Sequence, residues 1–299
     1  MAENERLAER FESHRAYLRA VAYRLLGSLA EADDAVQEAW LRVSSAGARD
    51  VENLGGWLTT IVARVALNML RARNARREES YGVHLPDPVV SREDDLQPEE
   101  EVLLADSVGL ALLVVLDSLG PAERLAFVLH DVFQLPFDEI APMVDRTPTA
   151  ARQLASRARR RIQRADIPQA DPDRVHQRAV VDAFFSAARE GDFDTLLTVL
   201  DPEVALRADF GPKHPARSVV IRGAAEVARS AMLGGALAGA RLIPALVNGA
   251  AGAVVTIGEH PFAVMGFIVA GGRIVEIDAI AESARVRRIA APVLGPPSG

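Results

Sequence analysis

The chain lacks cysteine altogether. This absence excludes disulfide bonds, thiol nucleophiles and zinc or iron–sulfur sites with cysteine ligands, and it fits a reducing cytoplasm. Lysine is nearly absent as well, because Lys213 is the one lysine among 34 basic residues. The others are arginines, which suit phosphate and guanine contacts, although a GC-rich coding sequence produces the same bias.

Long apolar runs are also missing. The stretch 243–257 is interrupted by Pro244, Asn248 and two glycines, so it falls short of the roughly 18–20 uncharged residues that a membrane span needs. The N-terminal sequence MAENERLAERFE is charged and has no apolar signal core. We therefore expect neither membrane insertion nor export, and a cytoplasmic location.

The composition is otherwise that of a globular protein. Hydrophobic residues make up 49% and charged residues 25% of the 299 residues, which excludes a wholly disordered chain and predicts two or three domains. The net charge of −7 comes from residues 78–102, which have one basic and nine acidic residues, whereas residues 1–77 and 103–165 carry +2 and +1. The overall acidity therefore does not argue against nucleic-acid binding by the flanking parts.

Composition also predicts the domain boundaries. Residues 78–102 contain three prolines and little helical periodicity, which indicates an acidic linker that is partly disordered. A second linker, residues 166–173, contains two prolines. We therefore predict helical domains at 1–77 and 103–165 and a C-terminal domain at 174–299, with a loose tail after about residue 290.

Apolar residues at helical spacing predict three helices in the first domain, at Arg6–Leu26, Ala30–Val43 and Trp57–Arg77. One face of the second helix carries polar and acidic residues, here called the acidic stripe: Asp33, Asp34, Gln37 and Glu38. Such a stripe is usually a solvated helix face, but it also fits docking of a basic partner. Several arginines, which either complement the helix C-terminus or follow a phosphate backbone, cluster on and beyond the third helix: Arg64, Arg71, Arg73, Arg76 and Arg77.

The most specific pattern covers residues 136–164. A short helix at Asp138–Val144, weakened by Pro142, precedes a tight turn at Asp145, and Thr147 then caps a second helix. Alanines form the inner side of this second helix, and its outer side carries Arg152, Gln153, Ser156, Arg157, Arg160 and Arg161. This is a helix-turn-helix pattern, since arginine can bind guanine and glutamine can bind adenine in the major groove. The alternative is a surface helix of an all-α bundle. Two further helices, predicted at 110–119 and 122–133, would form the bundle that supports the helix-turn-helix.

Three segments resemble bacterial extracytoplasmic-function (ECF) sigma factors in order and spacing. ADDAVQEAWLRV resembles region 2.2 of that family, and GGWLTTIVARVALNMLRARNARR resembles regions 2.3 and 2.4. LDSLGPAERLAFVLHDVFQLPFDEIAPMVDRTPTAARQLASRARRRIQ resembles region 4. The likeness covers about residues 6–165. It implies a protein that binds core RNA polymerase and directs promoter-specific initiation, without enzymatic chemistry, cofactor or metal.

The resemblance also implies roles for the two polar surfaces. The acidic stripe would dock on the β′ clamp of the polymerase, and the second domain would meet the β flap. Promoter DNA would be read at the minus-35 element by Arg152, Gln153, Ser156, Arg157 and Arg160. The loop 44–56 would capture a base of the minus-10 element, whose extrusion costs a few kcal/mol. Residues for this element or its phosphates would be Asn53, Arg64, Arg71 and Arg73. No separate anti-sigma partner is evident from the sequence.

The C-terminal residues predict two or three helices on a curved antiparallel sheet, with a hairpin turn at Gly271–Gly272. This α+β pattern resembles the SnoaL and ketosteroid-isomerase superfamily, a cone with an apolar pocket, and the whole chain resembles the SigJ-like subgroup that carries such a domain. The expected fold is therefore two all-α sigma domains, a helical bundle and then a helix-turn-helix, followed by an α+β cone. Two motifs of the subgroup are altered, since Asp209 alone remains of an Asp-Gly-Gly motif and AESARVRRI replaces an Asn-Pro-Asp-Lys-Leu-like motif.

For this domain we expect a regulatory role, with Asp209, Phe267 and Asp278 at a pocket or interface. Sensing of a small-molecule ligand is an alternative. Catalysis is another, since Asp209, His214, His260 and Asp278 are candidate acid–base residues, but no pair of them has a recognisable catalytic spacing. For the whole chain, the alternatives are a helix-turn-helix regulator that acts without polymerase and a ketosteroid-isomerase-type enzyme with a DNA-binding appendage.

Overall fold

The computed structural model describes residues 2–46, 53–77, 83–93, 110–165, 167–214, 217–235 and 239–295. The chain divides into two compact units. The first comprises residues 1–79, 97–108 and 112–167, and the second comprises residues 80–96, 109–111 and 168–299. Residues 83–93, from the middle of the predicted linker, therefore belong to the second unit.

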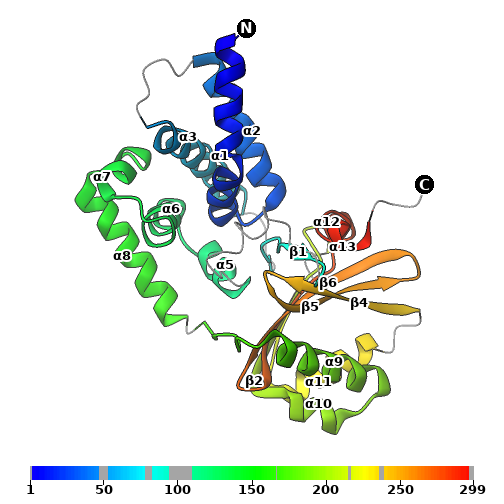
Figure 1. The fold of residues 1–299 in the computed structure, drawn as a ribbon. Helices are drawn as coiled ribbons and strands as arrows, with labels where there is room; N and C mark the ends of the chain where they lie inside the picture. Colours follow the sequence, from blue (N-terminus) through cyan, green and yellow to red (C-terminus); the bar gives the residue numbers. More distant parts are fainter. Residues whose placement is uncertain are drawn as a thin grey trace. The chain divides into compact units, whose positions relative to one another are not determined.

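The described part of the first unit is helical (Figure 1). Its N-terminal part is a bundle of α1 (Ala2–Leu26), α2 (Leu29–Ala46) and α3 (Leu54–Arg77). The three helices match the predicted ones and are a few residues longer at one or both ends. The apolar side predicted for α2 is buried against α1 and α3, and Trp40 packs on Phe11 with ring centroids 5.1 Å apart. The acidic stripe is exposed on the opposite side.

The remaining helices that the structure describes in the first unit follow in chain order. They are α5 (Leu110–Asp117), α6 (Pro121–Phe127), the π-helical η1 (Val128–Val132), α7 (Phe137–Ile140), the 3-10 turn η2 (Ala141–Met143) and α8 (Pro148–Arg164). The first helix of the predicted helix-turn-helix is shortened at Pro142, as expected, because proline has no N–H for a helical hydrogen bond. Asp145 takes the left-handed conformation, with φ of 55°, that a glycine adopts without strain.

The second unit is built on one mixed sheet of the described strands, in the order β1-β4-β5-β6-β7-β2-β3. The strands are β1 (Val90–Ser91), β2 (Leu200–Asp209), β3 (Val219–Arg222), β4 (Ala240–Val247), β5 (Ala250–Ile257), β6 (His260–Ala270) and β7 (Arg273–Ile280). The pair β2–β7 is parallel, which corrects the expectation of a wholly antiparallel sheet. A parallel pair is possible here because β2 and β7 are joined by a long connection instead of a tight turn.

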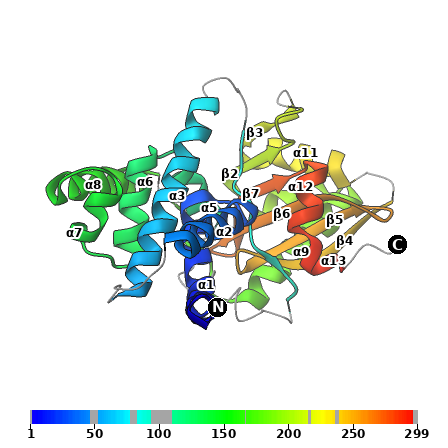
Figure 2. The same ribbon diagram turned by 90° about the horizontal axis from the view of Figure 1, so that it is seen from above.

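Three helices cover one face of this sheet: α9 (Arg174–Glu190), α10 (Phe193–Val199) and α11 (Ala224–Gly235). Between them and the sheet lies the core, in which the rings of Phe184, Phe185 and Phe267 meet edge to face at 5.4–5.6 Å. Two further described helices follow β7. The first, α12 (Ser283–Ile289), lies against β6 (Figure 2), and α13 (Ala291–Leu294) lies against β1 (Figure 1).

The turn between β6 and β7 is confirmed at Gly271–Gly272. Both glycines have positive φ, 58° and 74°, and Ala270 pairs with Arg273 across the turn. Both glycine N–H groups donate to the Asp171 carboxylate at 2.9 Å. These hydrogen bonds lower the pKa of Asp171 below its usual value, and the bond from Gly272 has the larger effect. The second predicted linker is thereby attached to the sheet.

Candidate functional site

The recognition helix of the helix-turn-helix is α8. Thr147 caps it, since the side chain accepts a hydrogen bond from the Ala150 N–H at 3.3 Å, and Pro148 occupies the first helical position. The inner stripe of Ala151, Ala155 and Ala158 is buried, as the sequence predicted. Of the residues assigned to the minus-35 element, Ser156 is half-buried and the other four are exposed: Arg152, Gln153, Arg157 and Arg160.

Two of these arginines are held by neighbours within the first unit. The Nε of Arg157 donates to Oε1 of Glu123 on α6 at 2.8 Å. The guanidinium of Arg152 lies 5.2 Å from the centre of the Phe137 ring, in cation–π geometry. Both arginines are thus engaged by contacts within the unit. Glu123 could not be predicted as this partner from the sequence, because it lies 34 positions before Arg157 and belongs to no periodic pattern.

The acidic stripe forms the exposed face of α2. Asp33 is paired with Arg19 of α1 at 2.6 Å, and Glu38 is paired with Arg42 of its own helix at 2.9 Å. Among the described residues, no hydrogen-bond partner is found for Asp34 and Gln37. The stripe is therefore an accessible acidic surface with two of its four side chains unengaged.

The residues assigned to the minus-10 element have unequal surroundings. Asn53 caps α3, because its Oδ1 accepts a hydrogen bond from the Gly56 N–H at 3.0 Å. The Nη2 of Arg64 donates to the Pro142 carbonyl at 3.0 Å, so it touches the helix-turn-helix part of the same unit. Arg71 is exposed, and no partner for it is found within the described residues. The side chains of Arg76 and Arg77 and residues 47–52 of the predicted loop lie outside the described residues.

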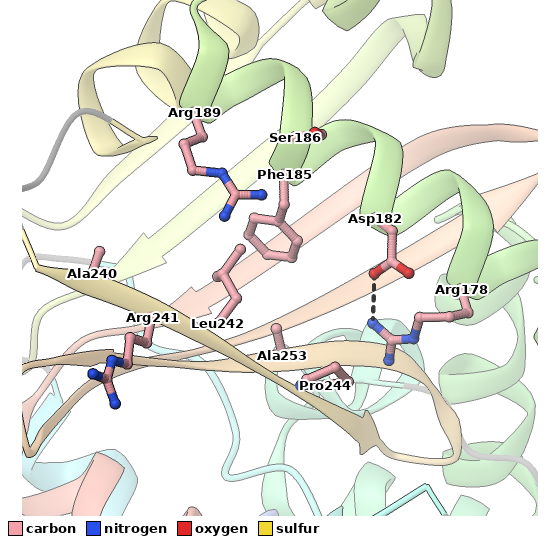
Figure 3. A pocket seen from close by; sticks show the side chains of 10 residues that line it. All are labelled: Arg178, Asp182, Phe185, Ser186, Arg189, Ala240, Arg241, Leu242, Pro244 and Ala253. Carbon is pink, nitrogen blue, oxygen red and sulfur yellow. Dashed lines mark ion pairs between the residues drawn. The ribbon is translucent and has the colours of Figure 1, made fainter.

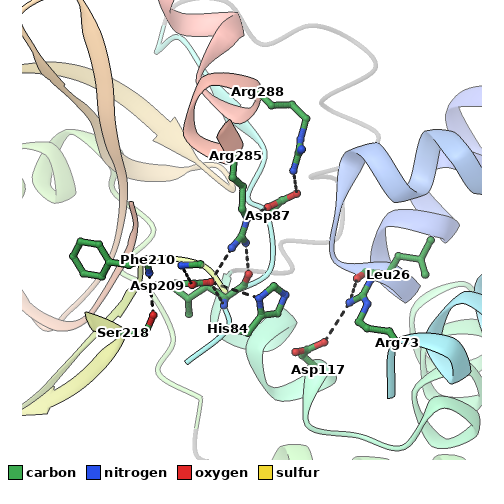
Figure 4. Close-up of polar contacts among 12 residues, drawn as sticks. Leu26, Arg73, His84, Asp87, Asp117, Asp209, Phe210, Ser218, Arg285 and Arg288 are labelled. Carbon is green, nitrogen blue, oxygen red and sulfur yellow. Dashed lines mark hydrogen bonds and ion pairs between the residues drawn. The ribbon is translucent and has the colours of Figure 1, made fainter. Parts of the chain in front are cut away.

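Arg73 belongs to a partly buried charge cluster that joins α1, α2, α3, α5 and α6. It donates to the Leu26 carbonyl at 3.0 Å and forms an ion pair with Glu31. Its Nη1 lies 3.7 Å from the Asp117 carboxylate (Figure 4). Asp117 also accepts a hydrogen bond at 3.1 Å from Arg124, which is 1% exposed.

The cluster extends to the first helix, since Arg124 also donates to the Arg24 carbonyl at 3.4 Å. An assigned DNA contact, Arg73, is thereby engaged with the helices that support α8. This cluster could not be predicted from the sequence, because the pattern around Asp117 and Arg124 is typical of ordinary helix-surface charges.

The segment 83–93 was predicted as linker, and it is docked on the second unit. Its strand β1 pairs antiparallel with β4, with Val90 opposite Val247. Next to the strand, Val89 and Asn248 exchange two hydrogen bonds, from the Val89 N–H to Oδ1 at 2.7 Å and from the Asn248 N–H to the Val89 carbonyl at 2.8 Å. Arg92 donates to the Val293 carbonyl at 3.2 Å. The linker is thus an edge strand of the C-terminal sheet.

A buried ion cluster fixes the other end of this segment. The guanidinium of Arg285 on α12 pairs with Asp87 and donates to the Leu85 carbonyl of the linker, and it pairs with Asp209 of β2 at 2.8 Å (Figure 4). The Leu85 N–H in turn donates to the Asp209 carboxylate at 2.9 Å. Burial by itself would lower the pKa of Arg285. The carboxylates of Asp87 and Asp209 raise it by more than burial lowers it, with the larger contribution from Asp87, so the pKa lies above its usual value.

The predicted regulatory residues lie in different surroundings. Asp209 lies in the buried ion cluster around Arg285, and Phe267 lies in the aromatic core between the helices and the sheet. Asp278 pairs with Arg207 at 2.7 Å across the parallel strands, and burial raises the pKa of its carboxyl despite that partner. The structure therefore joins Asp209 to the linker and does not gather the three residues around one pocket. The docked segment contains HLPDPVV, whose prolines and apolar residues distinguish it from the acidic residues around it. This apolar character is the sequence feature that indicates packing on a partner.

The described residues include neither a cluster of metal-ligating side chains nor a membrane-spanning helix. Within the described ranges, no group of three or more acidic, histidine or cysteine side chains is arranged to hold a metal ion. Among the helices that the structure describes, none combines the length and apolar character needed to cross a bilayer.

Comparison with known proteins gives a consistent assignment. The family model for Sigma-70 region 2 matches residues 10–76, and that for Sigma-70 region 4 matches residues 109–162. The chain is 41% identical over 249 residues to the ECF RNA polymerase sigma factor SigJ of Mycobacterium tuberculosis, covering 81% of this chain and 79% of that protein. It is 39% identical over 230 residues to the probable ECF RNA polymerase sigma factor SigI of the same species, covering 76% of each.

The likeness extends to the whole fold. The crystal structure of Mycobacterium tuberculosis SigJ matches with a TM-score of 0.72 at 34% identity, over 93% of this chain and 97% of that chain. The match spans the helical sigma regions and the C-terminal unit of helices on a mixed sheet. The chain therefore belongs to the ECF RNA polymerase sigma factors, which direct transcription initiation, and it carries a domain of helices on a mixed sheet behind region 4.

Proposed function

We propose that this sigma factor binds core RNA polymerase through the acidic stripe of α2 and reads promoter DNA through α8 and the arginines of α3. The observation that carries this proposal is the pairing of two accessible surfaces of opposite charge within one sigma unit. The acidic stripe is exposed on α2, and α8 presents four exposed polar or basic side chains beside a buried alanine stripe. Acidic surfaces fit a basic protein partner, and exposed arginines fit phosphates and guanine.

The partners follow from these surfaces. Core polymerase would contribute the β′ clamp to the acidic stripe and the β flap to region 4, and the DNA would be promoter DNA in the cytoplasm. The protein acts without chemistry of its own. In support, the candidate acid–base residues Asp209 and Asp278 are each committed to an arginine, Arg285 and Arg207.

The C-terminal domain regulates initiation by holding the linker between region 2 and region 4. Support comes from β1, which lies in the linker and completes the edge of the C-terminal sheet, and from the Arg285 cluster. A linker anchored in this way couples the separation of regions 2 and 4 to the state of the C-terminal domain. The C-terminal domain would then restrain the linker of the chain to which it belongs.

Charge reversal of the acidic stripe tests the polymerase contact. In the double variant Asp34→Lys, Glu38→Lys, we expect affinity for core polymerase to fall at least about tenfold, because opposite charges are replaced by like charges. Glu9→Lys, also exposed on the region 2 bundle, is the matched control and should bind as the wild type does. Equal binding by the double variant and the wild type, with circular dichroism showing both folded, would rule out this docking face.

Promoter readout is tested on α8. We expect Arg157→Ala to weaken discrimination of the minus-35 element by holoenzyme by about 1–3 kcal/mol, if its guanine contact is bidentate. Glu123→Ala removes the same ion pair but keeps the arginine, and Lys213→Ala changes a cation of the C-terminal unit. Both controls should keep the discrimination. A loss of equal size in Glu123→Ala would assign the effect to the ion pair and refute base contact by Arg157.

A further inference from the structure

A pocket of about 570 Å³ opens between α9 and the strands β4 and β5 of the C-terminal unit (Figure 3). Pockets of about 300–1,000 Å³ are the size that small molecules occupy. Its apolar wall is made by Phe185, Leu242, Pro244 and Ala253. In Figure 3 the Phe185 ring and the Leu242 side chain point toward each other from the helix and the strand. This wall could hold an aromatic or branched apolar body.

The charges around the pocket favour an anion. Its lining contains three arginines and one carboxylate, that of Asp182. Arg189 is exposed at the C-terminal end of α9, and its guanidinium lies beside Phe185 (Figure 3). In the part of the chain that the structure describes, it has no hydrogen-bond or ion-pair partner. An exposed guanidinium next to an apolar wall matches a carboxylate attached to an apolar body, since the planar fork can hold both carboxylate oxygens.

The other end of the pocket touches the linker. Arg178 lines the pocket, lies 3.6 Å from Asp182 and donates to the carbonyls of Ala245 and Gly252 at 3.0 and 2.9 Å. Its Nε also donates at 2.7 Å to Glu93, which belongs to the docked segment 83–93. One side chain is therefore shared by the pocket and the linker.

We propose that this pocket binds a small amphipathic carboxylate, with its apolar body on Phe185 and Leu242 and its carboxylate on Arg189, and that binding is coupled to the linker through Arg178. The coupling rests on the proposed function of the C-terminal domain. Occupancy brings a further anion into the electrostatic field of Arg178, which already faces Glu93 and Asp182, so the bound carboxylate and Glu93 oppose each other. Thermodynamic linkage makes this effect reciprocal. If the bound ligand weakens the interaction of Glu93 with Arg178 by some factor, loss of that interaction must raise the affinity for the ligand by the same factor.

The binding part is tested on the full chain with 1-naphthoate as the anionic probe and 1-naphthalenemethanol as its neutral counterpart. We expect saturable naphthoate binding by calorimetry, with affinity reduced about tenfold or more in Arg189→Ala, because the charge-assisted contact is lost. Arg273→Ala removes an exposed arginine outside the pocket and should bind as the wild type does. The neutral probe should bind Arg189→Ala and wild type equally. No saturable naphthoate binding, or equal affinities of the two arginine variants, overturns the proposal.

The coupling is tested with Glu93→Ala, which removes an exposed carboxylate and leaves Arg178 to the pocket. We expect a higher naphthoate affinity than in the wild type. An unchanged or lower affinity refutes the coupling, whatever the result for Arg189. These assays need neither polymerase nor promoter, so their failure is distinguishable from failure of the proposed sigma activity.

Discussion

Replacing Arg285 by alanine is expected to lower the free energy of unfolding of the C-terminal unit by about 3–5 kcal/mol, the usual cost of breaking a buried ion pair from one side. The side chains of Arg285, Asp87 and Asp209 are 8%, 4% and 1% exposed. Removal of the guanidinium would leave two carboxylates in a poorly solvated place. Arg288 would remain beside Asp87, but its side chain is 52% exposed and supplies a weaker, screened partner.

Chemical denaturation of the full chain measures this loss, and Arg287→Ala is the control. Arg287 precedes Arg288 on the same helix and is exposed, so its removal should change stability by no more than about 0.5 kcal/mol. Arg285→Lys should recover part of the stability, because an ammonium keeps the charge but not the planar fork. Equal stability of Arg285→Ala and Arg287→Ala would contradict a structural role of the cluster.

A comparison of Arg285→Ala with Asn248→Gly distinguishes an effect on stability from an effect on regulation. Asn248 has a positive φ of 50°, so glycine keeps the backbone while the side-chain bond to Val89 is lost. If the docked linker regulates initiation, Arg285→Ala and Asn248→Gly should shift promoter-dependent transcription in the same direction, because each frees the linker from a different side. Opposite shifts, or none in either variant, would show that docking has no regulatory effect.

Removal of Asp117 is expected to have a similarly large effect on the first unit. Its carboxylate, 12% exposed, faces Arg124 at 3.1 Å and Arg73 at 3.7 Å. Asp117→Ala would leave the 2% exposed side chain of Arg124 without this counter-charge, and we expect a loss of about 3–5 kcal/mol in the free energy of unfolding.

The matched control is Asp138→Ala, an exposed carboxylate of α7 in the same unit, which should be near neutral. Stability is measured by thermal and denaturant unfolding. Asp117→Asn keeps an acceptor for the Arg124 N–H and should fall between wild type and alanine. If Asp117→Ala unfolds at the same denaturant concentration as Asp138→Ala, the charge cluster contributes nothing to the packing of α5 and α6 on α1 and α3.

The helix-turn-helix could be predicted from sequence because its signals are local. A cap acts on an N–H three residues away, as Thr147 does on Ala150, and a buried helical stripe repeats every three or four residues, as Ala151, Ala155 and Ala158 do. Local signals also located the acidic stripe and the Gly271–Gly272 turn. The strand β4 was not predicted, because Pro244 lies inside it and removes a donor that a strand normally uses.

Partners far apart in the chain left no such signal. Glu123 and Arg157, or Asp117 and Arg73, are ordinary surface charges in sequence, and they meet because helices of one bundle pack together. Phe267 and Asp278 were both chosen as regulatory residues, and they differ in surroundings because neighbouring positions of a sheet point to opposite faces. Tertiary packing therefore decides which charged residues form ion pairs and which remain exposed.

The sequence by itself determined the two sigma regions and the α+β character of the rest, since periodicity, caps and turn residues act within a few positions. The tertiary structure alone decided the place of residues 83–93. Their acidic and proline-rich composition is typical of a free linker, yet they form a sheet edge held by Arg285, 198 positions from Asp87, and by Asp209, 124 positions from Leu85. An unpaired strand edge and a buried guanidinium both need partners, and which segment supplies them is settled when the chain folds.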